Sequence, residues 1–221
     1  VIRNSNADAV FAVYPFTPQP AITQALLTVA ECPVFVGVGG GTTTGKRSVQ
    51  MAAVSEMQGA AGCVVNSPAT AEMVEHITNI ADIPVIATVV RCDDDAHAKV
   101  RAGAKILNIA AGKNTPQVLR ELREHYPNLP LIAPGGKTPE SIRETIAAGA
   151  NAIIWTPPSA QQLQTDMMQR YRKMKEDATP VISHDDVPII DLVAAAEVSL
   201  VENMNPDVPI PVVVIERVAS I

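Results

Sequence analysis

Short apolar runs rich in valine and isoleucine alternate with segments of helix length along most of the chain. There are seven such runs, and they cover residues 9–14, 34–38, 63–65, 85–90, 106–109, 131–133 and 152–155. Apolarity that is continuous rather than alternating is typical of a parallel strand that is buried on both faces. The pattern therefore predicts a parallel sheet in which a helix follows each strand, either as a closed barrel or as an open doubly wound sheet.

The residues that precede these runs fall into two classes, and the classes alternate. Small residues precede the first, third, fifth and seventh runs, whereas Pro33, Pro84 and Pro130 precede the other three. The repeating unit is therefore a pair of strand–helix modules. Open sheets rarely keep so regular a module, and 221 residues are enough for one barrel domain. We expect an α/β fold of the TIM type, a (β/α)8 barrel.

The pattern leaves two origins open for the eighth strand. Residues 1–4 resemble the end of a helix and no methionine precedes them, as expected of a barrel that lacks its first strand. Alternatively, residues 179–182 continue the proline class at the right spacing. In either case we expect a barrel domain over residues 1–175 and a C-terminal extension over residues 176–221.

The extension departs from the repeat and is rich in apolar residues. Residues 187–204 are expected to form an apolar helix, and residues 209–215 an extended segment that Pro211 limits to the edge of a sheet. An apolar surface of this kind has to be covered. We therefore expect the extension to pack on the barrel or on a second subunit, which would make the protein a homo-oligomer such as a homodimer.

Composition and charge argue against several classes of partner. A net charge of −6 and an aromatic content of 3% argue against nucleic acid and against an anionic membrane surface. The three cysteines, Cys32, Cys63 and Cys92, fit neither a disulfide framework nor a metal motif, so we expect a reducing, cytoplasmic location. No motif predicts a resident cofactor. The one ion left open is Mg²⁺, held mainly by a substrate phosphate.

Two glycine-rich loops follow strands, at the end of a parallel sheet where ligands bind. The first contains Gly40–Lys46, which fits the spacing GxxxxGK of a nucleotide-binding P-loop, but Arg47 follows where that motif has serine or threonine. The motif therefore gives only weak support for nucleotide binding. The loop still offers backbone N–H groups, hydroxyl groups and Lys46 to an anion.

The second loop, Gly135-Gly136-Lys137, follows the sixth run, and Thr156–Ser159 follows the seventh. In these motifs the sequence resembles the phosphate-binding (β/α)8 barrel superfamily, which includes ribulose-phosphate-binding enzymes, thiamine-phosphate synthase and aldolases of the keto-deoxy-phosphogluconate type. The resemblance implies that Gly135, Gly136, Lys137, Thr156 and Ser159 bind phosphate. Because that superfamily places this site after strands seven and eight, the resemblance favours a missing first strand. The alternative is that the two glycines only form a tight turn.

Polar side chains that could carry chemistry gather near the ends of the strands; they are Tyr14, Asn66, Ser67, Thr88, Arg91, Cys92, Asp93 and Asn108. We expect Lys46, Arg91 and Asn108 to polarise the reacting end of a substrate and Asp93 to move a proton. The alternative for Asp93 is a helix cap. No strand carries a lysine placed for a Schiff base, and no histidine is placed beside Cys92 by the sequence.

Together these residues predict an enzyme, a lyase or an isomerase, that acts on a small phosphorylated metabolite. The alternative is a barrel that binds such a metabolite, or serves as a scaffold, without catalysis, because few carboxylates lie at the strand ends.

Overall fold

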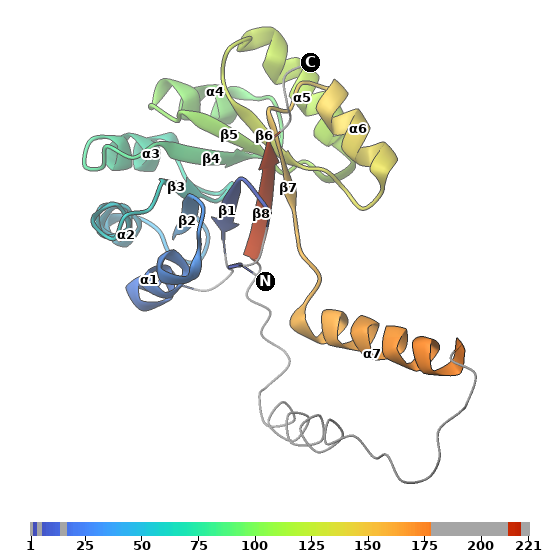
Figure 1. The fold of residues 1–221 in the computed structure, drawn as a ribbon. Helices are drawn as coiled ribbons and strands as arrows, with labels where there is room; N and C mark the ends of the chain where they lie inside the picture. Colours follow the sequence, from blue (N-terminus) through green and yellow to red (C-terminus); the bar gives the residue numbers. More distant parts are fainter. Residues whose placement is uncertain (1, 4–5, 14–16, 178–211, 218–221) are drawn as a thin grey trace. The chain divides into compact units, whose positions relative to one another are not determined.

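The computed structural model describes residues 2–3, 6–13, 17–177 and 212–217 (Figure 1). Its strands form a closed barrel in the order β1 to β8, so the predicted TIM-type fold is confirmed. Neighbours from β1 to β7 are parallel. The strands are β1 (Ala9–Ala12), β2 (Val34–Gly39), β3 (Gly62–Val65), β4 (Val85–Val89), β5 (Ile106–Ile109), β6 (Leu131–Pro134), β7 (Ala152–Trp155) and β8 (Val212–Arg217).

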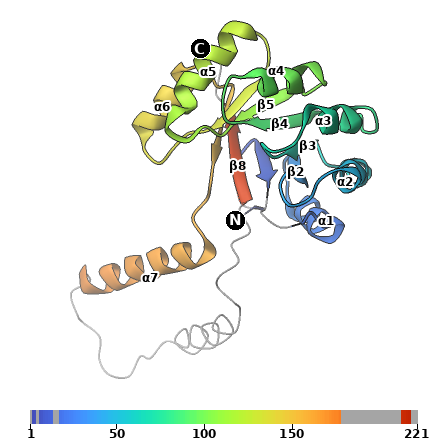
Figure 2. The ribbon, with the colours of Figure 1, turned by 180° about the vertical axis from the view of Figure 1, so that it is seen from behind.

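Helices α1 to α6 lie around the outside of these strands (Figures 1 and 2). Within the described residues, no helix is both long enough and apolar enough to span a membrane. The helices are α1 (Pro20–Val29), α2 (Lys46–Met57), α3 (Ala71–Thr78), α4 (Asp94–Arg101), the 3₁₀ turn η1 (Gly112–Asn114), α5 (Thr115–His125), α6 (Pro139–Ala147) and α7 (Ala160–Asp177).

The eighth strand comes from the C-terminal part of the chain and runs against the others. Ala9 of β1 is opposite Ile215, and Trp155 of β7 is opposite Val214, both in antiparallel pairs. The prediction that residues 209–215 form an edge is therefore wrong for β8, which has a neighbour on each side. β8 also takes the place in the barrel that a strand before residue 1 was expected to fill. Residues 179–182 and 187–204 lie outside the described part of the chain.

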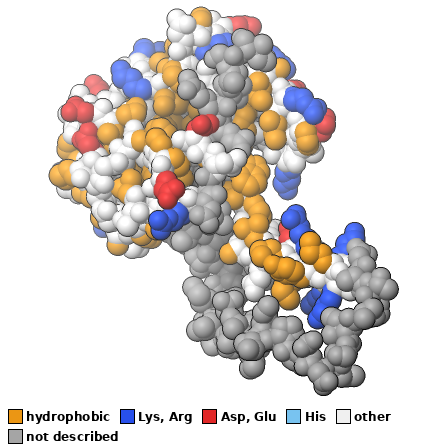
Figure 3. Space-filling model, viewed as in Figure 1, with side chains coloured by type: hydrophobic (Ala, Val, Ile, Leu, Met, Phe, Trp, Pro, Cys, Tyr) orange, Lys and Arg blue, Asp and Glu red, His pale blue; other side chains and the backbone are white. Residues whose placement is uncertain are grey.

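The chain divides into two compact units. One contains Val1–Pro157 together with Pro211–Ile221, and the other contains Pro158–Ile210. In the second unit, the described helix α7 carries a group of exposed apolar side chains on the face seen in Figure 3. They are Leu163, Met167, Met168, Tyr171 and Met174.

Apolar side chains of the strands fill the barrel below its mouth. Phe11, Val64, Ile86, Ile132 and Ile154 belong to a buried cluster that is made of strand residues alone. The other cluster combines strand residues with residues of the surrounding helices, so it lies outside the barrel wall. Since side chains alternate across a strand, the first cluster lies inside the barrel and closes it.

Candidate active site at the barrel mouth

A polar layer lies directly above this apolar cluster, at the ends where the parallel strands finish. Three of its residues stand two positions after a member of the apolar cluster: Asn66, Thr88 and Thr156. A fourth, Asn108, stands two positions after Ile106, which packs against that cluster. The spacing of two keeps these side chains on the inner face. They border a cavity of about 320 Å³, the mouth cavity, which is lined by Phe11, Val13, Asn66, Thr88, Asn108, Ala110, Pro134, Ile154 and Thr156.

Asn108 is a buried polar residue of the mouth whose hydrogen bonding is incomplete. The residue is 8% exposed. The amide Nδ2 donates to Thr88 Oγ1 at 3.1 Å. The amide oxygen Oδ1 has no partner among the residues that the structure describes. A buried acceptor without a donor typically costs about 1–3 kcal/mol, and a ligand that donates to it would remove this cost.

The mouth cavity is electrically neutral as far as the structure describes it. Its polar side chains are amides and hydroxyls, and none of the lining residues carries a carboxylate. Mg²⁺ in proteins is usually held by carboxylates, so these side chains do not fit a magnesium site. Across the described residues, no group of three or more His, Cys, Asp or Glu side chains is placed to hold a metal ion.

The predicted phosphate loop begins where the mouth cavity ends, since Pro134 lines the cavity and Gly135 follows it. A Cβ atom at Gly135 would lie 2.6 Å from Ile153 Cγ2 and 2.9 Å from Ile142 Cγ1. Gly136 has a φ of +80°, and a Cβ atom there would overlap Ser141 Oγ. Both positions therefore require glycine for packing and backbone conformation, whether or not the loop binds a ligand.

The same loop leads into helix α6 through a complete capping box. Ser141 N donates to Thr138 Oγ1 and Thr138 N donates to Ser141 Oγ, each at 3.2 Å. Two N–H groups of this helix start are therefore used internally. Lys137 is exposed just before it, whereas Glu140 pairs with Arg143 at 3.4 Å. The positive charge available to an anion on this loop is that of Lys137.

The residues predicted to bind phosphate are divided between the two compact units. Gly135, Gly136, Lys137 and Thr156 belong to the barrel unit, and Ser159 belongs to the other unit. Ser159 also has a structural role, because its Oγ accepts a hydrogen bond from Gln162 N at 3.2 Å at the start of α7. Its own N–H donates to Gln162 Oε1 at 2.9 Å.

Arg91 and Asp93 follow β4 and pair with each other rather than facing the mouth cavity. Arg91 Nε lies 3.6 Å from Asp93 Oδ2. Asp93 Oδ1 accepts a hydrogen bond from Ala96 N at 3.1 Å and caps α4. The capping alternative for Asp93 is therefore confirmed, and its proton-transfer role stays a prediction.

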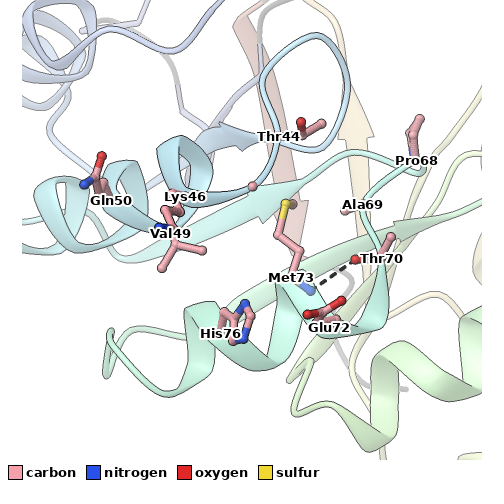
Figure 4. Close-up of a pocket in the computed structure, with 11 residues that line it drawn as sticks. Thr44, Lys46, Val49, Gln50, Pro68, Ala69, Thr70, Glu72, Met73 and His76 are labelled. Carbon is pink, nitrogen blue, oxygen red and sulfur yellow. Dashed lines mark hydrogen bonds between the residues drawn. The ribbon is translucent and has the colours of Figure 1, made fainter.

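Lys46 lines a different cavity, a groove of about 550 Å³ between α2 and α3 (Figure 4). Met73 points from α3 into this groove, and Lys46 reaches it from the first turn of α2 (Figure 4). The groove shares no lining residue with the mouth cavity. Ser48, the next hydroxyl residue after Lys46, is buried and donates to Thr43 O at 3.1 Å, so it is not available as a P-loop ligand.

The structure reveals a histidine beside Cys92 that the sequence analysis missed. His97 Nε2 lies 3.9 Å from Cys92 Sγ, and His97 Nδ1 lies 2.7 Å from the hydroxyl of Tyr126. Burial, and after it the nearby carboxylates of Glu121, Asp93 and Glu124, raise the pKa of the Cys92 thiol. The thiol is therefore kept protonated, which is unfavourable for a nucleophile. The signal available in the sequence was the five-residue spacing from Cys92 in the loop after β4 to His97, the fourth residue of α4.

A buried lysine was also missed. Lys99 of α4 is fully buried, and its Nζ donates to Ser67 O at 2.7 Å and to Asp95 Oδ2 at 2.6 Å. Ser67 lies in the loop after β3, so the buried Lys99 links α4 to that loop. Neither of its partners lines the mouth cavity.

Comparison with known proteins gives similarity in fold alone. No family model matches the sequence, and no curated protein matches it. The structure of phosphonopyruvate hydrolase matches with a TM-score of 0.55 and 17% identity over 83% of this chain and 76% of that one. Phosphoenolpyruvate phosphomutase from Streptomyces platensis subsp. rosaceus gives 0.53 and 16% over 83% and 76%.

Thiamine phosphate pyrophosphorylase from Pyrococcus furiosus matches with a TM-score of 0.52 and 18% identity over 67% of this chain and 72% of that one. Its name refers to thiamine phosphate, and it shares the barrel fold with this chain. The resemblance expected from the sequence is therefore confirmed at the level of the fold: the chain is a TIM-type barrel of the kind that those proteins share.

Proposed function

We propose that the protein is an enzyme, a lyase or an isomerase, that acts on a small phosphorylated metabolite at the barrel mouth. The observation that supports this most is the mouth cavity, where amides and hydroxyls stand above an apolar layer and the glycine loop follows directly. Ligands of this fold bind at this end of the barrel. The names of phosphonopyruvate hydrolase and phosphoenolpyruvate phosphomutase, which share the fold, refer to phosphorus-containing compounds.

In this proposal the phosphate lies on the loop and the reacting end lies in the mouth cavity. Gly135 and Gly136 would line the phosphate with their backbone, Lys137 supplies a positive charge, and Thr156 supplies a hydroxyl from the next strand. Asn108 would touch the reacting end. Lys46 is not part of the proposal, because it lines the groove between α2 and α3.

Proton transfer is the role proposed for Asp93, which does not line the mouth cavity, so its carboxylate would have to leave its pair with Arg91 to reach the substrate. The side chains of its pair with Arg91 are 77% exposed for Arg91 and 43% exposed for Asp93. Opening an exposed pair of this kind costs only about 0–1 kcal/mol. Asp93→Asn keeps an oxygen that can cap α4 but removes the base. We expect this variant to bind organic phosphates as the native protein does and to lose turnover.

The phosphate site can be tested by thermal shift with inorganic phosphate and a panel of small organic phosphates. The unfolding temperature of the native protein should rise with ligand concentration, because a ligand that binds only the native state stabilises it. Lys137→Glu should abolish most of this rise. Lys105→Glu is the matched control, since Lys105 is exposed and lies just before β5 at the opposite end of the barrel. An equal loss in both variants, or no rise with any phosphate, would contradict the proposal.

A barrel that binds the metabolite without catalysis is the second candidate. The observation that favours it is the absence of a titratable side chain among the described residues that line the mouth cavity. Tight binding by the native protein without turnover of any bound compound would favour this candidate over the enzyme.

A further inference from the structure

We infer that the end of the ligand inside the mouth cavity carries a hydroxyl group, and that Asn108 and Thr88 recognise it. The inference rests on the proposed function, because it takes the loop after β6 as the place of the phosphate. It adds what the proposed function leaves open, namely the chemical class of the other end of the ligand.

The two residues form a buried polar pair on neighbouring strands, β4 and β5. Each residue is 8% exposed, and both line the mouth cavity. Asn108 Nδ2 donates to Thr88 Oγ1 at 3.1 Å, so Thr88 acts as the acceptor in this bond. Asn108 Oδ1 remains without a partner among the described residues. The pair therefore offers one unused acceptor to a ligand.

The pair also offers a donor beside that acceptor. A threonine hydroxyl that accepts one hydrogen bond still has its own proton to donate, and no described residue accepts it. An amide oxygen can only accept, so the ligand atom next to it has to donate. A hydroxyl group does both: its oxygen accepts from Thr88, and its proton is donated to Asn108 Oδ1. A carboxylate or a keto oxygen only accepts and would face Asn108 Oδ1 unfavourably.

The rest of the cavity favours a neutral, compact group. Phe11, Val13 and Ile154 present carbon surfaces to a skeleton of a few atoms, and none of the described lining residues is charged. The volume of about 320 Å³ is at the small end of ligand pockets. A charged second end would be buried without a partner, which is costly. The ligand class is therefore a small organic phosphate whose other end is an alcohol.

Three probes of similar size separate these chemistries. Glycerol 3-phosphate carries hydroxyls, propyl phosphate has the same carbon chain without them, and phosphoglycolate carries a carboxylate. We expect calorimetric titration of the native protein to show glycerol 3-phosphate binding about tenfold tighter than propyl phosphate, the size of one net hydrogen bond. Phosphoglycolate should bind no better than propyl phosphate.

Single substitutions then show which residues cause the preference for glycerol 3-phosphate over propyl phosphate. Asn108→Leu and the isosteric Thr88→Val should each bring glycerol 3-phosphate down to the affinity of propyl phosphate and leave the latter unchanged. Lys137→Glu should weaken both probes equally and keep their ratio. Thermal unfolding of each variant without ligand shows whether it is folded. Because the two substitutions lie on separate strands, one variant still tests the inference if the other does not fold.

The outcomes distinguish the inference from the proposed function. Equal affinity for the two probes in the native protein, or a preference that survives in both Asn108→Leu and Thr88→Val, would overturn the inference and leave the phosphate site intact. Tighter binding of phosphoglycolate would overturn it as well, since it would mean that the amide of Asn108 presents its NH₂ group to the ligand. Failure of all three probes to bind would overturn both.

Discussion

The two ends of the barrel differ in how fully their polar groups are hydrogen-bonded. We call the end of the barrel where the parallel strands begin the floor. There, a single guanidinium group donates hydrogen bonds to several backbone carbonyl oxygens. Arg123 donates to the carbonyl oxygens of Tyr126, Pro127, Leu129 and Gly149 and to Asn151 Oδ1. At the mouth, Asn108 Oδ1 has no donor among the described residues.

Other floor contacts follow the same rule. Asn151 Oδ1 accepts a second hydrogen bond, from Leu131 N at 2.9 Å, at the start of β6. Glu56 Oε1 accepts from Asp82 N at 2.7 Å and from Ile83 N at 3.0 Å, just before β4. The floor contacts therefore fix where strands enter the barrel, whereas the mouth has unused hydrogen-bonding capacity at the end where ligands of this fold bind.

The largest effect is expected from removing the centre of the floor network. Arg123→Ala leaves five acceptors without their donor and should lower the free energy of unfolding by about 2–4 kcal/mol in urea denaturation. Arg120→Ala is the control on the same helix, because its pair with Glu144 at 3.8 Å is exposed. That control should cost at most about 1 kcal/mol. Similar losses in the two variants would refute the special role of the floor network.

The next effect tests how well the barrel wall around β3 excludes water. Burial raises the pKa of the Cys63 thiol to about 12, compared with about 8.5 in an unfolded chain. Above pH 8.5 the unfolded state loses this proton and the folded state keeps it, so stability should fall as the pH rises. The expected slope is about 1.4 kcal/mol per pH unit between pH 9 and the folded pKa.

Urea denaturation at pH 8 and pH 10 measures this slope. Cys63→Ala should remove that part of it, whereas the same substitution at the half-buried Cys32 should remove less, although burial raises its pKa too. If Cys63→Ala leaves the slope unchanged, the wall around β3 admits water.

The smallest effect is expected at the mouth. Asn108→Leu removes a buried acceptor that has no donor, and it also removes the hydrogen bond from Asn108 Nδ2 to Thr88 Oγ1, so the two contributions oppose each other and the free energy of unfolding should change by less than about 1 kcal/mol. Asn151→Leu, the matched change at the floor, removes an oxygen that accepts two hydrogen bonds and should lower it by about 1–2 kcal/mol. Equal losses at both positions would show that the two ends do not differ.

The sequence predicted the parallel strands well because their signal is local. Residues 106–109 and 152–155 were expected as strands and match β5 and β7 in their bounds. Helix starts were less accessible, because side-chain caps mark only some of them: α6 begins with the capping box of Thr138, whereas α5 has Asn114 as its N-cap without a side-chain cap bond. The antiparallel β8 could not be predicted, because its place depends on the two edges that β1 and β7 leave open.

The candidate site was predicted in part for the same reason. Asn66, Thr88 and Asn108 were found because each is a polar residue at or near the end of an apolar strand, and Thr156 because of the family resemblance. The floor contacts of Arg123 were missed, since they join a helix to loops that only the fold brings together. The unpaired state of Asn108 Oδ1 likewise depends on every neighbour in space rather than on any motif.

The direction of β8 has a consequence for how the chain is organised. Because β7 and β8 are antiparallel, with Trp155 opposite Val214, the chain leaves the barrel and returns to it at the same rim, the rim that carries the mouth. In topological terms, everything between the two strands is the loop of one β-hairpin. Hairpin loops accept long insertions at little entropic cost. The barrel and its inserted segment can therefore vary independently in length and sequence.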